Sequence, residues 1–111
     1  MGITTHVLDT SRGHPASGIH VTLEILDGTS WRRLGNGLTD EDGRLRTLLG
    51  DTAVEQARYR ITFDTGSYYA QQGIATFFPA VAIVFDINDA LQHYHVPLLL
   101  SPFGYSTYRG S

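Results

Sequence analysis

Regular alternation of apolar and polar residues predicts a protein made of short β-strands. The alternation is clearest over residues 19–26, where every second side chain is Ile, Val or Leu and points to one face. Similar patterns, separated by turn-forming Gly, Pro, Asp and Asn residues, predict further strands at 3–9, 31–38, 44–46, 58–63, 82–87, 93–100 and 105–109. Residues 50–57 lack such a pattern and are expected to form a loop.

One short helix is predicted after the strand at 58–63. Asp64 is a good N-cap residue, and Gly73 provides a stop at the other end of the segment. Many short strands with scarcely any helix indicate an all-β protein, an antiparallel β-sandwich. Because the 111 residues contain no internal repeat, linker or low-complexity tract, we expect a single domain over residues 1–111.

The end of the chain predicts a hairpin whose first strand has two unequal faces. One face is apolar and belongs in the core; it carries Tyr94, Val96, Leu98 and Leu100. The other face is only half polar; it carries His93, His95, Pro97 and Leu99. We expect this second face to be covered, most simply by a second subunit. A turn at 101–104, containing Pro and Gly, leads into the last strand.

Composition narrows the possible partners and chemistry. The chain has no Cys, which excludes a disulfide framework, a thiolate zinc site and a cysteine nucleophile. All eight basic residues are Arg, and with eleven acidic residues the net charge is −3. This balance gives no general attraction to nucleic acid, so a small-molecule partner is expected.

The sequence offers no targeting signal. Residues 1–6 lack a basic segment and a long apolar run, and no stretch of about 18 apolar residues occurs anywhere. The last three residues are not a Ser-Lys-Leu-type peroxisomal signal. We therefore expect no membrane association and a cytoplasmic protein, with a periplasmic protein whose leader has been removed as the alternative.

Two stretches near the ends of the chain carry a recognisable signature. The first is TTHVLDT at 4–10, and the second is YHVPLLLSP at 94–102 followed by YSTYRGS at 105–111. Between them, TDEDGR at 39–44 and FFP at 77–79 fit the same pattern. Together they resemble the 5-hydroxyisourate hydrolases of the transthyretin-like family. This resemblance implies two four-stranded sheets with one short helix, and a homotetramer, a dimer of dimers in which the last two strands contribute to the contact between dimers.

The resemblance also implies a set of site residues. His6, Arg44 and His95 fall on the family's catalytic positions, and Ser111 is expected to add a hydroxyl and a carboxylate that position substrate or water. The substrate-binding set implied by the family consists of His6, Arg44, His95, Tyr108, Arg109, Gly110 and Ser111. A neutral imidazole suits a general base near neutral pH, and the planar guanidinium of arginine suits a urate-like carbonyl. The sequence does not decide which histidine is the base.

The implied reaction is hydrolysis of 5-hydroxyisourate, a product of urate oxidation, to 2-oxo-4-hydroxy-4-carboxy-5-ureidoimidazoline without a cofactor. A non-catalytic transthyretin-like carrier of small aromatic ligands is the main alternative, and a structural or binding module is a third. Hormone-carrying transthyretins lack the combination of His6, Arg44, His95 and the tail at 108–111.

Other polar residues receive simpler interpretations. His93 and His95 are spaced so that they could bind zinc, but no third ligand is evident, so no metal is predicted. His14 and His20 have no motif support; His14 is expected to be solvent-exposed in a turn, and His20 to lie on the outward face of a strand. Ser111 lacks the Gly-x-Ser-x-Gly context of a strained nucleophile, so we do not expect it to attack the substrate.

Overall fold

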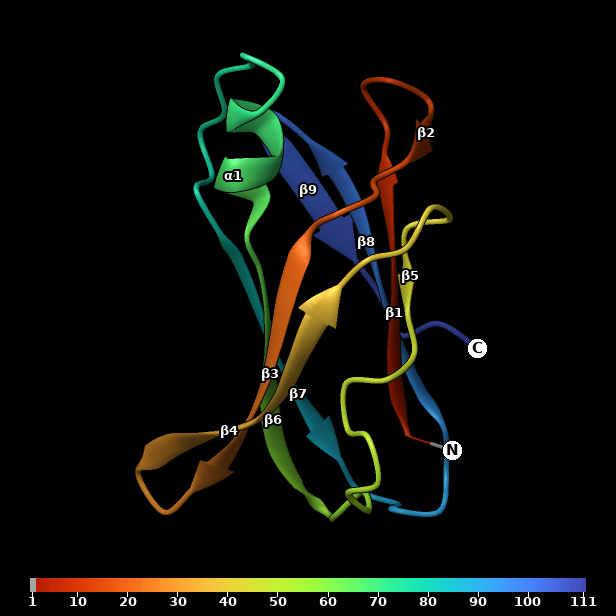
Figure 1. The fold of residues 1–111 in the computed structure, drawn as a ribbon. Coiled ribbons are helices and arrows are strands. Elements are labelled where there is room, and N and C mark those ends of the chain that lie inside the picture. The colour runs from red at the N-terminus through yellow and green to blue at the C-terminus, as the bar shows by residue number, and fades with distance from the viewer. Residues whose placement is uncertain (1) are drawn as a thin grey trace.

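The computed structural model describes residues 2–111, which form two stacked β-sheets with one short helix at one end (Figure 1). The first sheet contains β1 (Ile3–Asp9), β2 (His14–Pro15), β5 (Arg44–Leu45), β8 (Tyr94–Ser101) and β9 (Gly104–Thr107). The second sheet contains β3 (His20–Asp27), β4 (Ser30–Leu38), β6 (Ala57–Phe63) and β7 (Val81–Ile87). Their orders are β2-β1-β8-β9, with β5 also pairing with β1, and β4-β3-β6-β7. The predicted two-sheet sandwich is therefore confirmed.

Two details of the sandwich differ from the prediction. β1 and β8 pair in parallel, so the sheets are not purely antiparallel. The first sheet also has five strands rather than four, because the two-residue strands β2 and β5 both pair with β1. Alternation in the sequence reports which face a side chain takes, but it carries no information about strand direction or neighbours.

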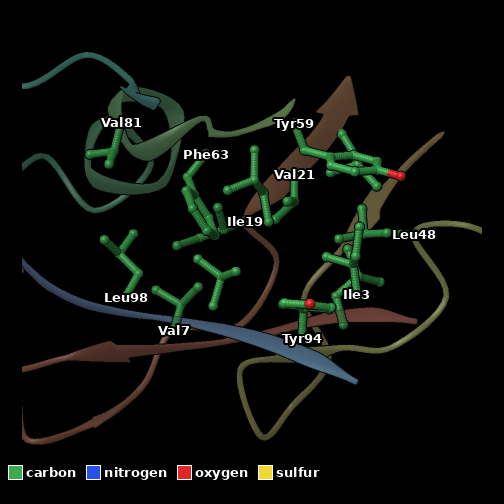
Figure 2. Packing of buried hydrophobic residues seen from close by; sticks show 14 of the residues in the cluster. Ile3, Val7, Ile19, Val21, Leu48, Tyr59, Phe63, Val81, Tyr94 and Leu98 are labelled. Atoms are coloured by element: carbon green, nitrogen blue, oxygen red, sulfur yellow. The ribbon is translucent and has the colours of Figure 1, made fainter. Parts of the chain in front are cut away.

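The core lies between the inner faces of the two sheets (Figure 2). Val7, Ile19, Val21, Phe63 and Leu98 have no exposed side-chain surface, and the apolar face predicted for 94–100 is buried throughout. Burying each large apolar side chain contributes on the order of 1.5–3 kcal/mol. Packing against the second sheet covers the inner face of the five-stranded sheet, and its outer face carries the polar side chains described below.

The helix α1 (Thr65–Ala70) begins where Asp64 was predicted to cap it. The Asp64 carboxylate accepts hydrogen bonds from the Ser67 backbone N–H at 3.1 Å and from the Ser67 hydroxyl at 2.7 Å. The helix is shorter than predicted because residues 71–73 form a turn, which ends at Gly73 with φ of 69°. The expected stop residue therefore closes a turn rather than the helix itself.

A buried carboxylate ties α1 to the first sheet. Asp9, at the end of β1, is completely buried, and its Oδ2 accepts a hydrogen bond of 2.8 Å from the Tyr68 hydroxyl. Its Oδ1 accepts a second bond, of 2.6 Å, from the Ser11 hydroxyl. Burial, followed by the contact with Asp9, raises the pKa of Tyr68, so this phenol stays protonated and donating. A buried carboxylate with partners at both oxygens fixes the helix against the sheet.

The second face of β8 is covered partly by the chain itself. Pro97 is buried, and a Cβ built on Gly110 would lie 3.2 Å from its Cγ. The returning tail therefore covers part of this face within one chain, and the expectation that a second subunit covers the rest stays a prediction. Leu99, on the same face, is half-buried.

No helix within residues 2–111 is long and apolar enough to cross a membrane.

Candidate functional site

The polar side chains of β1 lie on the outer face of the five-stranded sheet. Ile3, Thr5 and Val7 point into the core, so the alternation turns Thr4 and His6 outward. Parallel pairing sets Thr4 beside His95 and His6 beside Pro97 on β8. This register joins residues from opposite ends of the chain on one surface.

Arg44 reaches the same surface from β5, where it pairs with His6. The turn before it is tightly held: Asp40 Oδ1 accepts hydrogen bonds from the Asp42 and Arg44 backbone N–H groups at 2.9 and 3.0 Å. The Arg44 N–H bond is the main reason that the pKa of Asp40 is lowered. Gly43 closes the turn with φ of 76°, and a Cβ there would lie 2.4 Å from the Val7 carbonyl oxygen. The turn thus places Arg44 through contacts that only glycine allows.

His6 has one ring nitrogen committed to the backbone. Its Nε2 lies 2.8 Å from the Asp42 carbonyl oxygen. Because a carbonyl only accepts hydrogen bonds, the proton of the neutral ring lies on Nε2, and Nδ1 is left bare. His6 therefore has a fixed tautomer and is tethered to the turn that carries Arg44.

His95 is held by two contacts of different kinds. Its Nδ1 lies 2.8 Å from the Thr4 hydroxyl oxygen, and the same oxygen is 2.9 Å from Nε2 of His93. On the other side, Gly110 packs so closely that an added Cβ would be 2.5 Å from Cδ2 of His95. Burial is the main cause that lowers the pKa of His95, and electrostatic interactions with the neighbouring His6, His93 and Arg44 act in the same direction. The ring is thus positioned and kept neutral at neutral pH.

A cavity of about 220 Å³ opens beside these residues. It is lined by Thr4, Arg44, Arg46, His93, His95 and Ser111. Pockets for drug-sized ligands usually measure roughly 300–1,000 Å³, so this cavity suits a smaller, polar molecule. Arg44, His95 and Ser111, three of the predicted site residues, therefore share one cavity. His6 does not line it but pairs with Arg44 in the sheet.

Tyr108 and Arg109 do not line this cavity. Both line a second, more apolar hollow of about 310 Å³ between β7 and the tail, which His95 also lines. The Arg109 guanidinium is 4.6 Å from the centre of the Tyr94 ring, and its Nη2 donates a 2.6 Å hydrogen bond to Gln92 Oε1. The contacts of Arg109 thus anchor the tail, while the Gly110 N–H donates a 2.8 Å bond to the His95 carbonyl.

The sequence interpretation gave no role to Thr4 or Arg46. Both line the cavity, and Thr4 contacts His95 directly. Thr4 lies two residues before His6 in a strand, so alternation alone would have placed both on one face. Arg46 carries no comparable signal. Within residues 2–111 there is no group of three or more His, Asp or Glu side chains arranged to hold a metal ion.

Comparison with known proteins shows the family of the chain. The model of the HIUase/Transthyretin family matches residues 3–110. The chain is 45% identical to a 5-hydroxyisourate hydrolase of Salmonella dublin, over 98% of this chain and 80% of that protein. The 5-hydroxyisourate hydrolase structure of Klebsiella pneumoniae superposes with a TM-score of 0.86 at 38% identity, covering 98% of each chain.

The fold is also similar to that of a transthyretin. Sea bream transthyretin in complex with thyroxine superposes with a TM-score of 0.91 at 30% identity, covering 97% of this chain and 93% of that one. Fold similarity therefore does not separate the hydrolases from the transthyretins, and the side chains of the site must do so. By its match over nearly its full length, the chain belongs to the HIUase/Transthyretin family.

Proposed function

We propose that this protein hydrolyses 5-hydroxyisourate to 2-oxo-4-hydroxy-4-carboxy-5-ureidoimidazoline, a step of urate degradation. The observation that carries the proposal is the convergence of Arg44, His95 and Ser111 on one cavity, with His6 beside Arg44. The names of the Salmonella and Klebsiella relatives support the choice of substrate. The reaction is hydrolysis of a cyclic amide and uses no cofactor.

His95 is our candidate for the general base. It lines the cavity, whereas His6 is tethered to the Asp42 carbonyl outside it. Because the pKa of His95 is lowered, its ring is neutral near neutral pH and is able to accept a proton from water attacking the ring carbonyl. His6 supports this arrangement by holding the turn before Arg44.

Arg44 is our candidate for substrate binding and oxyanion stabilisation. Its guanidinium lines the same cavity and offers two parallel N–H donors to a carbonyl or an anion. One well-placed donor of this kind is commonly worth about 3–4 kcal/mol in the transition state. Ser111 adds a hydroxyl at the rim, and Tyr108, Arg109 and Gly110 hold it there, with Arg109 acting mainly as an anchor of the tail.

The decisive experiment generates 5-hydroxyisourate from urate with a urate oxidase and follows its absorbance. We expect the protein to accelerate the decay well beyond the spontaneous rate. No acceleration by a folded protein would overturn the hydrolase proposal and favour the carrier, which then should bind small aromatic ligands without changing them.

Variants test the individual roles. His95→Ala and His6→Ala are each expected to lower turnover by about 10²–10⁴-fold while the fold stays intact. His20→Ala is a matched control, since His20 is a strand histidine on the other sheet, bonded to Asn36. Circular dichroism identifies any variant whose loss reflects unfolding. Near wild-type rates for both His6→Ala and His95→Ala would refute the assignment.

Arg44→Lys tests the geometry of the guanidinium. Lysine keeps the charge but provides a single point of contact, so we expect most activity to be lost. Arg33→Lys, an exposed residue of β4, is the control for the same chemical change elsewhere. Equal activity of the two variants would show that charge alone suffices.

We also propose a homotetramer, a dimer of dimers. Large aromatic side chains of the final hairpin and the loop that packs on it are solvent-exposed; they include Phe77, Phe103, Tyr105 and Tyr108. Exposed apolar groups gathered in this way are typical of subunit contacts. Light scattering should give the mass of four chains, and a fully active monomer would contradict the proposal. The cytoplasmic location expected from the sequence stays a prediction.

A further inference from the structure

One hydroxyl group connects two imidazoles on the outer face of the sheet. Thr4 Oγ1 lies 2.8 Å from Nδ1 of His95 and 2.9 Å from Nε2 of His93. The two rings are nearly parallel, with centroids 6.5 Å apart and planes 25° apart. His95 is half-buried beside the cavity, whereas His93 is exposed to water. The hydroxyl therefore joins a ring at the site to a ring in contact with solvent.

This contact differs in kind from the one that holds His6. The carbonyl partner of His6 only accepts, so it fixes one tautomer. A hydroxyl has one proton to donate and lone pairs with which to accept. If it donates to His93, it accepts from Nδ1–H of His95 and leaves Nε2 of His95 bare. If it donates to His95, it accepts from Nε2–H of His93, and the His95 proton lies on Nε2.

We propose that Thr4 is a positioning residue that couples the tautomer of His95 to the proton on His93, forming a proton relay from the site to solvent. The inference rests on the proposed hydrolysis for its use, but the coupling itself needs no substrate.

The proton transfers of the relay balance over the two steps of the reaction. Nε2 of His95 takes a proton from the attacking water, Nδ1 of His95 passes its own proton to the Thr4 oxygen, and the hydroxyl proton moves to Nε2 of His93. When the ring nitrogen of the substrate leaves, the transfers reverse: Nε2 of His95 gives its proton to that nitrogen as Nδ1 regains one from Thr4. No net proton remains on the protein.

The surroundings explain why His93 should hold the proton between the two steps. His95 is partly buried and close to the positive charge of Arg44, and both disfavour a second proton on its ring. His93 shares the cavity with Arg46 and Ser111 as well, but its ring is exposed and hydrated. Transfer through Thr4 moves the positive charge to where water stabilises it.

The first test removes the hydroxyl. Thr4→Val should lower kcat by about tenfold to a hundredfold with KM changed only slightly, and Thr4→Ser should restore most of the rate, since it keeps the hydroxyl. Thr22→Val, on the outer face of the other sheet, is the matched control and should keep wild-type kcat. Wild-type kcat in Thr4→Val, or a Thr4→Ser variant as slow as Thr4→Val, would overturn the proposal.

The second test asks whether the relay continues to His93. His93→Phe, at an exposed position, should lower kcat as much as Thr4→Val does, and the double variant should be no slower than either single one. His20→Phe controls for loss of a histidine elsewhere. A wild-type rate in His93→Phe, or losses that multiply in the double variant, would overturn the relay.

The third test reads the tautomers without substrate. In protein labelled with nitrogen-15 at histidine, NMR shifts distinguish bare from protonated ring nitrogens. We expect the proton of neutral His95 to move from Nδ1 to Nε2 as acidification adds a proton to His93, and this link to be lost in Thr4→Val. A His95 tautomer that does not change while His93 titrates would refute the coupling. If the wild-type protein fails to hydrolyse 5-hydroxyisourate, the proposed function is wrong, and this measurement still decides the coupling.

Discussion

Substituting Gly110 by alanine provides a sharp test of the site, because the structure gives the size of the disturbance. The new Cβ would lie 2.5 Å from Cδ2 and 3.1 Å from Cγ of His95, and 3.2 Å from Cγ of Pro97. Carbon atoms normally pack no closer than about 3.5 Å, so the imidazole or the tail must move by about 1 Å. A movement of that size would stretch the 2.8 Å contact between His95 and Thr4 beyond hydrogen-bond distance.

The expected consequence is loss of activity without loss of fold. A catalytic group misplaced by about 1 Å commonly costs about a hundredfold in rate, which corresponds to about 2.7 kcal/mol of transition-state free energy. The backbone of Gly110 is not in the left-handed region, so the alanine adds a contact and no torsional strain. Thermal unfolding should therefore stay close to that of the wild type.

The assay is the decay of 5-hydroxyisourate formed by urate oxidase, with kcat and KM measured separately. Gly104→Ala is the matched control: it lies at the start of β9, six residues before Gly110, and its added Cβ would meet only Ser101 Oγ at 3.7 Å. We expect this control to keep wild-type activity. A Gly110→Ala variant with wild-type kcat, or equal losses in both variants, would refute the argument that the tail positions His95.

Three further predictions follow from contacts described above. Tyr68→Phe removes one hydrogen bond to the completely buried Asp9, so the free energy of unfolding measured with denaturant should fall by about 1–3 kcal/mol. An unchanged unfolding midpoint would contradict the role of this contact in holding α1 against the sheet. Leu98→Ala opens a cavity in the core and should cost about 2–5 kcal/mol by the same measurement; a loss below 1 kcal/mol would argue against this packing. The pKa of His95 lies below the usual 6.5, so kcat/KM should stay level as the pH falls through 6.5 and should decline only at lower pH. A profile of kcat/KM against pH that already declines at or above pH 6.5 would exclude His95 as the base.

Much of the fold follows from the sequence because strand alternation is a local property. The faces predicted for β3, β6 and β8 are confirmed, and each follows from residues that are close together in the chain. The parallel pairing of β1 with β8 was missed, since alternation is the same for either direction. The cover over Pro97 was missed for a similar reason: it depends on Gly110, which returns along β8 only after the final turn.

The site was predicted in part. Family resemblance named His6, Arg44 and His95, and the register brings them to one face, although their chemical roles stay predictions. Thr4 was overlooked because a threonine in a strand is ordinarily read as a residue that favours β-structure. The contact that suggests its role, 2.8 Å between the Thr4 hydroxyl and His95, joins residues 91 positions apart and is seen only in the folded structure.

The parallel pairing of β1 with β8 also has a consequence for how the molecule folds. β1 stays unpaired along this edge until β8, near the other end of the described chain, has been made. The contacts between the two strands span about 90 residues of chain. Closing so long a loop is entropically costly, and proteins dominated by such distant pairings fold slowly. During that interval the unpaired edge of β1 is open to association with other chains. Docking of the final hairpin onto β1 should therefore limit the rate of refolding, and catalytic activity should return only with that last step.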